Sequence, residues 1–154
     1  MRRKRLHIAG TYSAESLLEL DNDKARYLGR VLRLRIGDGL LVFDGEGNEY
    51  AATIGAIGKT SATLRIGSKT ASRTETGLRV HLVQGISRGE RMDFVVQKAT
   101  ELGVKRITPV LTEHGVVKLD AERAEKRRDH WQKVAVSACE QSGRVRLPLI
   151  DTPT

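Results

Sequence analysis

The chain has 154 residues, with 27 lysines and arginines against 19 acidic residues and a formal net charge of +8. Hydrophobic residues make up 39% of it, a globular value, and no stretch approaches the roughly 20 apolar residues of a membrane-spanning helix, so membrane and disordered classes are excluded. The single cysteine, Cys139, excludes an internal disulfide and favours a reducing cytoplasm. The positive excess indicates a polyanionic partner, most simply nucleic acid. Because only 4% of residues are aromatic, single-strand recognition by base stacking is not expected.

The N-terminal part of the chain alternates short extended patterns with turns. Residues 40–44 and 49–54 read as strands around the turn sequence Gly45-Glu46-Gly47-Asn48, which predicts a hairpin. After a second turn, residues 62–66 predict a third strand, and residues 6–8 offer a fourth. Closely spaced strands of this kind indicate a small antiparallel barrel or sandwich.

One helix is predicted inside this region, over residues 22–33, with an N-cap among Asp21–Asp23. Arg26, Arg30 and Arg33 fall at spacings of four and three and would share one side of the helix. No acidic residue follows Asp23 within the predicted helix. The arginines form either a solvated basic face or a phosphate-binding surface.

A polar, glycine-bounded stretch at residues 67–77 marks a domain boundary. We expect one domain over residues 1–72, a linker at 73–77 and a second domain over 78–154. The net charge divides evenly, because residues 1–75 and residues 76–154 each carry an excess of four basic side chains.

Beyond the linker the pattern alternates strand and helix. A strand over residues 78–84 precedes a helix for which Ser87 and Glu90 form a capping box, with Gly103 as its C-terminal stop. A second strand over residues 106–111 would lie parallel to the first, since a helix connects them. The predicted apolar face of the helix comprises Met92, Val95, Val96, Ala99 and Leu102.

A long helix follows, from an N-cap at Asp120 through Ser142 to a stop at Gly143. Residues 147–150 begin a third strand, so the second domain is an α/β unit with a parallel sheet. We expect the apolar helix face to be core; it comprises Trp131, Val134, Ala135, Ala138 and Cys139.

The stretch Gly85-Ile86-Ser87-Arg88-Gly89 fits the nucleophile elbow of serine hydrolases, and Ser87, Asp120 and His130 follow in the triad order. Asp120 and His130 lie on one helix, about 15 Å apart along its axis, so Asp120 could not orient the His130 ring. The four histidines show no metal-ligand spacing, and no metal is expected.

A polar group surrounds the end of the long helix. It comprises Glu140, Gln141, Ser142, Arg144 and Arg146. Arg144 could simply interact favourably with the negative C-terminal end of the helix dipole. Alternatively, a carboxylate, an amide, a hydroxyl and a guanidinium at one helix end form a site for a polar planar ligand.

Three stretches of the second domain resemble one known family. They are QGISRGERMDFVVQKATELGV at residues 84–104, RITP at 106–109, and the segment from Trp131-Gln132-Lys133 to Glu140-Gln141-Ser142-Gly143-Arg144. The chain resembles the RsmE family of bacterial 16S rRNA uridine-N3 methyltransferases. In the N-terminal part, residues 30–33, 37–38 and 43–47 look like that family's PUA-like RNA-binding barrel.

The resemblance implies a two-domain α+β fold. It consists of a PUA-like antiparallel β-barrel followed by the first part of an α/β SPOUT, or trefoil-knot, methyltransferase domain. It also implies S-adenosylmethionine as cofactor, 16S rRNA of the small ribosomal subunit as partner, a homodimer and no membrane. Family members continue past the point matching Thr154 into the knot, so the cofactor pocket is expected C-terminal to this residue, and this chain alone is expected to be inactive.

By similarity, Glu140, Gln141, Ser142 and Arg144 would lie near the target base, with Arg144 the first choice for holding the uridine or its phosphate. Contacts to the RNA backbone would come from six arginines: Arg5, Arg26, Arg30, Arg33, Arg88 and Arg91. A non-catalytic module for rRNA binding or ribosome assembly is the alternative. We further expect strands near Val80 and Ile107 to lack sheet neighbours, and the second domain to be less stable than the first.

Overall fold

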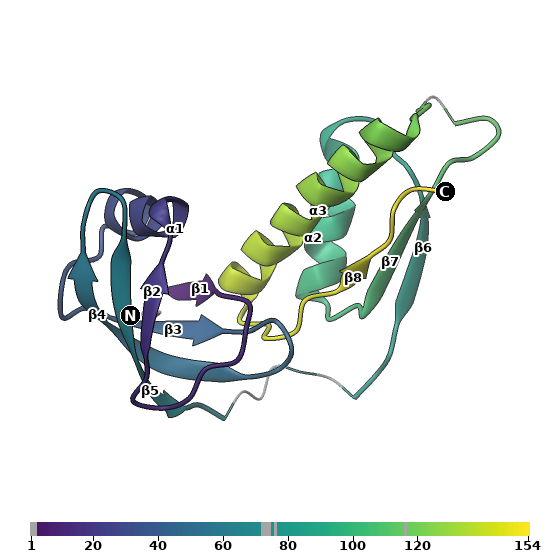
Figure 1. The fold of residues 1–154 in the computed structure, drawn as a ribbon. Helices are drawn as coiled ribbons and strands as arrows, with labels where there is room; N and C mark the ends of the chain where they lie inside the picture. The colour runs from purple at the N-terminus through teal and green to yellow at the C-terminus, as the bar shows by residue number, and fades with distance from the viewer. Residues whose placement is uncertain (1–2, 72–74, 76, 116) are drawn as a thin grey trace. The chain divides into compact units, whose positions relative to one another are not determined.

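The computed structural model describes residues 3–71, 75, 77–115 and 117–154 (Figure 1). The chain divides into two compact units, unit 1 over Met1–Arg73 and unit 2 over Thr74–Thr154. Most of the predicted linker, at positions 73, 74 and 76, lies outside the described residues. No helix in the described ranges is long and apolar enough to cross a membrane.

Unit 1 is built on a curled five-stranded sheet. Its strands are β1 (Arg5–His7), β2 (Leu17–Leu20), β3 (Gly39–Phe43), β4 (Glu49–Ile57) and β5 (Ala62–Lys69), in the order β1-β3-β4-β5-β2. The predicted hairpin, third strand and N-terminal strand are all present. One expectation was wrong: β1 pairs with β3 in parallel, with Leu6 opposite Val42. Only the other three pairings are antiparallel.

The core of unit 1 lies on one face of this sheet, because buried and exposed residues alternate along β3 and β5. Helix α1 (Asn22–Arg26) and the wide turn η1 (Tyr27–Val31) add Ala25 and Leu28 to that core. The cap at Asp21 is confirmed, since its carboxylate accepts the Lys24 N–H at 2.9 Å.

The helix ends before Arg33, contrary to the prediction. The Leu32 N–H donates to the Tyr27 carbonyl, and the Leu34 N–H donates to the Leu28 carbonyl. This turn requires a left-handed residue between them, and Arg33 has a φ of +55°. Arg33 therefore lies outside the helix that carries Arg26 and Arg30.

Unit 2 contains the predicted parallel sheet. Strands β6 (His81–Gly85), β7 (Arg106–Val110) and β8 (Leu149–Ile150) lie in sequential order. Helices α2 (Glu90–Glu101) and α3 (Ala121–Ser142) pack against one face of that sheet (Figure 1). Strand β7 pairs with β6 on one side and β8 on the other, so the expectation that the strands near Val80 and Ile107 lack sheet neighbours was wrong.

The helix ends of unit 2 test the predicted caps. Asp120 caps α3 by accepting the Arg123 N–H at 2.8 Å, and Gly143 ends it in the left-handed region. The capping box of α2 was wrong: the N-cap is Gly89, with φ +61° and no side-chain cap. The helix begins two residues later than the sequence pattern suggested, so the Ser87 side chain is too far from its first turn to cap it.

The core of unit 2 joins both helices to the sheet. Trp131 is fully buried there with Met92, Val96 and Ile107, and Cys139 is buried too. The predicted apolar face of α2 was wrong at Leu102, which occupies the C-cap position and is 76% exposed. On the sheet face opposite the helices, Val83 and Leu149 are 60% and 58% exposed.

Candidate nucleic-acid interface

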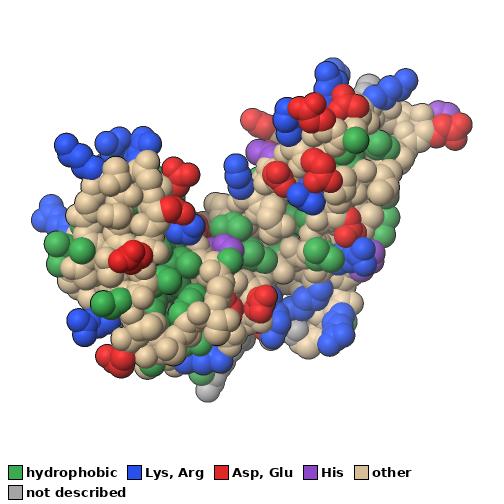
Figure 2. Space-filling view, viewed as in Figure 1, with side chains coloured by type: hydrophobic (Ala, Val, Ile, Leu, Met, Phe, Trp, Pro, Cys, Tyr) green, Lys and Arg blue, Asp and Glu red, His purple; other side chains and the backbone are tan. Residues whose placement is uncertain are grey.

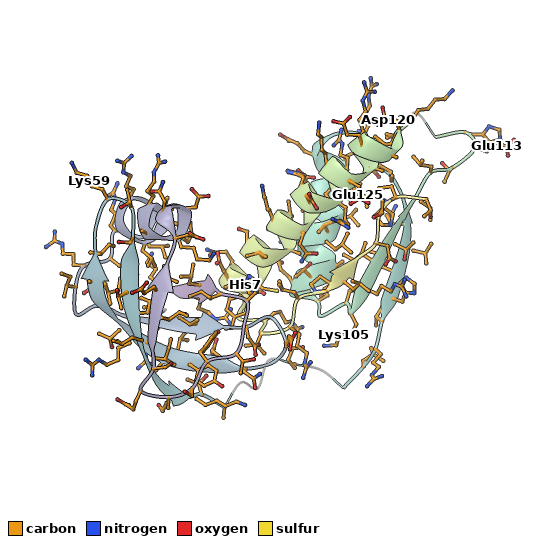
Figure 3. All side chains as sticks on the ribbon, viewed as in Figure 1. His7, Lys59, Lys105, Glu113, Asp120 and Glu125 are labelled. Carbon is orange, nitrogen blue, oxygen red and sulfur yellow. The ribbon has the colours of Figure 1, made fainter. Side chains whose placement is uncertain are left out.

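Basic side chains occur on the surfaces of both units, interspersed with acidic ones (Figure 2). Asp120 stands at the start of α3 and Glu113 on the loop before it (Figure 3). Binding of a polyanion therefore depends on local clusters of basic side chains that lack an acidic partner.

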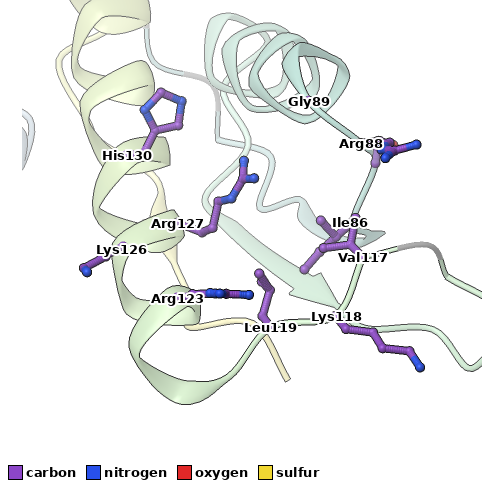
Figure 4. A pocket seen from close by; sticks show the side chains of 11 residues that line it. Ile86, Arg88, Gly89, Val117, Lys118, Leu119, Arg123, Lys126, Arg127 and His130 are labelled. Carbon is purple, nitrogen blue, oxygen red and sulfur yellow. The ribbon is translucent and has the colours of Figure 1, made fainter.

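A cavity of about 670 Å³ opens on unit 2 beside α3 (Figure 4). Three segments form it: the loop 86–89 that leads into α2, residues 117–119, and α3 between Arg123 and His130. Six of its lining residues carry basic side chains and none is acidic: Arg88, Lys118, Arg123, Lys126, Arg127 and His130. We call this hollow the α3 cavity.

The cations of the α3 cavity differ in how far they are neutralised. Lys126 pairs with Glu122 at 2.5 Å, and Arg123 lies 3.5 Å from Asp120. Among the described residues, Arg88, Lys118 and Arg127 have no hydrogen-bonding or ionic partner. Figure 4 shows the guanidinium groups of Arg123 and Arg127 extending from α3 into the hollow. The result is a concentration of unbalanced positive charge.

An apolar surface completes the α3 cavity. Ile86, Val117 and Leu119 line it, and all three are half-buried. A hollow with one apolar side and several guanidinium groups suits a ligand that has both a flat apolar part and a negative charge.

The serine-hydrolase interpretation gains no support from this region. His130 bonds to Asp93 of α2 at 2.8 Å, and the same carboxylate accepts the Trp131 indole N–H at 3.2 Å. Asp120 is committed to the α3 N-cap, as expected. Within the described part of the chain, Ser87 makes no hydrogen bond to His130.

The polar group at the end of α3 is drawn into structural contacts. The Arg144 Nε donates to the Glu101 carbonyl at 3.0 Å, so its guanidinium binds the C-terminal end of α2. A Cβ on Gly103, which has φ +87°, would lie 2.9 Å from the Arg144 guanidinium carbon. Arg144 therefore joins the two helix ends.

The other members of this group stay close to Arg144. The Arg144 N–H donates to the Ser142 hydroxyl at 3.5 Å, and Glu140 and Gln141 occupy the last turn of α3 with contacts of their own. The structure thus brings these residues to one helix end. Nothing in their geometry assigns them a chemical role.

Glu75 is a neighbour that the sequence pattern did not single out. Its carboxylate binds Lys105 Nζ at 2.7 Å and accepts the backbone N–H groups of Val145 and Arg146. Burial raises the pKa of this carboxyl, but these donors more than offset the effect and hold its pKa below the ordinary value. Glu75 therefore fixes the segment that follows α3.

The predicted RNA-binding arginines of unit 1 separate into three environments. Arg26 and Arg30 are exposed on the α1–η1 segment. Arg33 instead lines a hollow of about 380 Å³ with Arg3 and Lys4, next to Asp38. The three guanidinium groups therefore do not form one helix face.

The structure contradicts the prediction that Arg5 contacts the RNA backbone. Its guanidinium is buried, binds Glu49 at 2.6 Å and lies 4.6 Å from the centre of the Phe43 ring. A buried, paired guanidinium cannot reach a phosphate, so Arg5 is a core residue of unit 1.

Two arginines of unit 2 remain available. Arg88 and Arg91 are both exposed, and Arg88 lines the α3 cavity. The sequence pattern missed Lys118, Arg123 and Arg127. The signal was present in the spacing of Arg123 and Arg127, four residues apart on one helix face, but only the fold brings the loop 86–89 to them.

Two family models match the chain in order. One, described as an RNA methyltransferase PUA domain, matches residues 20–67, and one described as an RNA methyltransferase domain matches residues 74–154. The second match covers more than half of the chain, so the chain belongs to the family of RNA methyltransferases.

Within that class the resemblance to the RsmE family is confirmed by similar proteins. A ribosomal RNA small subunit methyltransferase E from Buchnera aphidicola is 32% identical over 97% of this chain and 59% of its own length. The same enzyme from Bacillus subtilis is 28% identical over 85% of this chain and 51% of its own length. The chain thus spans between half and two thirds of these relatives.

Two solved structures share the fold. The ribosomal RNA small subunit methyltransferase E of Neisseria gonorrhoeae, bound to S-adenosylmethionine, has a TM-score of 0.93 and 38% identity, over 99% of this chain and 62% of that one. A Legionella pneumophila methyltransferase with bound S-adenosylmethionine has a TM-score of 0.94 and 39% identity, over 100% of this chain and 64% of that one. The predicted two-domain fold class is confirmed.

Proposed function

We propose that this chain forms the RNA-binding domain and the first part of the catalytic domain of an rRNA methyltransferase. The enzyme would transfer a methyl group from S-adenosylmethionine to N3 of a uridine in 16S rRNA. The observation that carries this proposal is the match to both family models in order, together with 38% identity to an S-adenosylmethionine-bound structure. The predicted domains at 1–72 and 78–154 are part of the proposal.

The described residues are suited to holding RNA. Arg26 and Arg30 in unit 1, and Arg88 and Arg91 in unit 2, are exposed cations that can neutralise phosphates. Methylation of N3 requires loss of the uracil proton and alignment of the nitrogen with the methyl donor, which is mainly a matter of positioning. Glu140, Gln141, Ser142 and Arg144 remain candidates for that positioning, although Arg144 is already bonded to Glu101.

The α3 cavity does not by itself fit the cofactor. The α3 cavity is lined by six basic side chains and no carboxylate, which disfavours a sulfonium cation. The described ranges also hold no group of three side chains that could bind a metal ion. The function left to these residues is to bind and orient the RNA. A cytoplasmic homodimer acting on the small subunit completes the proposal.

A chimera tests the catalytic part. This chain would replace the matching part of the Neisseria gonorrhoeae enzyme, and the chimera would be expressed in cells whose 16S rRNA lacks 3-methyluridine. We expect mass spectrometry to detect the modified base. A folded chimera that binds 16S rRNA without modifying it would favour the alternative, a non-catalytic assembly module.

Fluorescence anisotropy with a structured 16S rRNA fragment tests the RNA-binding part. The double variant Arg26→Gln/Arg30→Gln should weaken binding by about tenfold and flatten the dependence on salt, since each lost phosphate contact lowers the slope by about 0.7 to 0.9. Arg65→Gln, an exposed arginine on β5, is the control. Equal weakening by the control would show that only total charge matters.

A further inference from the structure

We propose that the α3 cavity binds one nucleotide of the RNA. Its phosphate would lie between Arg123 and Arg127, and its base would lie against Ile86, Val117 and Leu119. The inference rests on the proposed function only in taking RNA as the source of the nucleotide.

The charge of the cavity selects an anion. Arg127 extends into the hollow and has no ionic or hydrogen-bonding partner in the described part of the chain. Arg88 and Lys118 also line the hollow and likewise have no such partner there. Arg123 is the nearest second guanidinium, one helical turn away, and its contact with Asp120 is long at 3.5 Å. Two guanidinium groups on one helix face can each give a phosphate a charge-assisted hydrogen bond.

The start of α2 adds to this field. Gly89, its N-cap, lines the cavity and supplies no side-chain acceptor to the first turn. The 12-residue helix α2 therefore directs the positive end of its dipole at the edge of the same hollow, although Glu90 and Asp93 in its first turn reduce this contribution below that of the arginines.

The apolar side of the cavity separates a nucleotide from a bare phosphate. A phosphate gains nothing from Ile86, Val117 and Leu119, whereas a base can bury part of its flat face against them. The volume of about 670 Å³ is within the range of sites that hold small organic ligands.

Titrations of the whole chain with uridine monophosphate and with inorganic phosphate test the assignment. At low salt, calorimetry should show uridine monophosphate binding at least fivefold more tightly than phosphate, because the base adds apolar contact. Arg127→Gln should weaken uridine monophosphate by about tenfold, the loss expected for one charge-assisted contact.

Arg128→Gln is the matched control. Arg128 is the next residue on α3, is paired with Glu125 at 3.0 Å and Asp129 at 2.9 Å, and does not line the cavity. The Arg128→Gln variant should bind uridine monophosphate with the same affinity as the original chain. Arg127 is exposed, so its replacement leaves the core intact, which a thermal melt would verify.

Equal affinity for phosphate and uridine monophosphate, or an unchanged affinity in Arg127→Gln, would overturn the inference. The rRNA fragment separates this failure from that of the proposed function. Normal rRNA binding by Arg127→Gln would reject the cavity and leave the proposed function in place. If the original chain binds uridine monophosphate but not the rRNA fragment, the proposed function is rejected and the cavity assignment stands.

Discussion

The two units cover their sheets in different ways. In unit 1, the curled sheet and the α1–η1 segment enclose a core that includes Leu28, Val42 and Leu64, all fully buried. In unit 2, both helices pack on one face of the parallel sheet, and Val83 and Leu149 on the other face are more than half exposed. Parallel sheets are normally covered on both faces. The mostly antiparallel sheet of unit 1 can leave one face to solvent, whereas the parallel sheet of unit 2 has a face without the expected covering layer among the described residues.

The two units also differ in the surroundings of their arginine side chains. Unit 1 buries Arg5 against Glu49, which turns a member of the basic N-terminal run into a core ion pair. Unit 2 leaves Arg127 exposed and without an acidic partner in the described ranges, where it can bind a ligand. The same residue type thus forms a buried ion pair in one unit and lines a cavity in the other.

The largest effect should come from Trp131→Ala. Trp131 fills the centre of the unit 2 core and donates its indole N–H to Asp93. Its removal should lower the free energy of unfolding of unit 2 by about 4 kcal/mol. Hydrogen exchange should show lost protection in β7 and α3 and none lost in β3 to β5. Leu64→Ala should give the reverse pattern, and loss in both units from either variant would show that they unfold together.

Arg5→Met should destabilise unit 1 by about 3 kcal/mol, because it leaves the buried Glu49 carboxylate without its cation. Thr70 would be the remaining donor to that carboxylate, at 2.8 Å. The double variant Arg5→Met/Glu49→Met should recover most of the loss, as measured by urea unfolding. If the double variant is as unstable as the single one, the stacking of Arg5 on Phe43 matters more than the ion pair.

Glu75→Gln should destabilise unit 2 by about 1 to 2 kcal/mol at pH 7, since it weakens hydrogen bonds to a charged acceptor. The pKa of Glu75 is lower in the folded chain than in the unfolded one. Its stabilisation is therefore complete above the unfolded pKa and is lost as the pH falls through the folded pKa. The gap between Glu75→Gln and the original chain should close as the pH falls from 6 to 3. Glu113→Gln, at an exposed loop position, is the control for the loss of one carboxylate.

Much of the fold could be predicted because it follows from local sequence. Four predicted features each depend on residues within one turn or strand: the apolar run of β3, the alternation along β5, the cap at Asp120 and the stop at Gly143. The strand β2 was missed because only four residues form it, and they are held by pairing with β5, far along the chain. The parallel pairing of β1 is another long-range choice that no local pattern encodes.

The site was less predictable for the same reason. The burial of Arg5 depends on Glu49, 44 residues away, so the basic run around it gave a misleading signal. The engagement of Arg144 with Glu101 and the meeting of Arg127 with Ile86 likewise arise from how α2, α3 and the sheet pack. Local patterns identified which residues are polar or basic, and only tertiary packing decided which of them remain available.

The smallest effect should come from Val83→Thr, which tests the open sheet face of unit 2 directly. Threonine keeps the β-branched shape that suits a strand, and Val83 is 60% exposed. If the face is open in solution, the change should alter the free energy of unfolding by less than about 0.5 kcal/mol.

A loss above about 1 kcal/mol that grows with protein concentration would mean that a second molecule covers this face. The original chain would then show a concentration-dependent melting temperature that Val83→Thr lacks. If association occurs through the β6–β8 sheet, the hydrogen-exchange protection of unit 1 should stay constant over the same concentrations. This internal reference separates such association from a general effect of concentration.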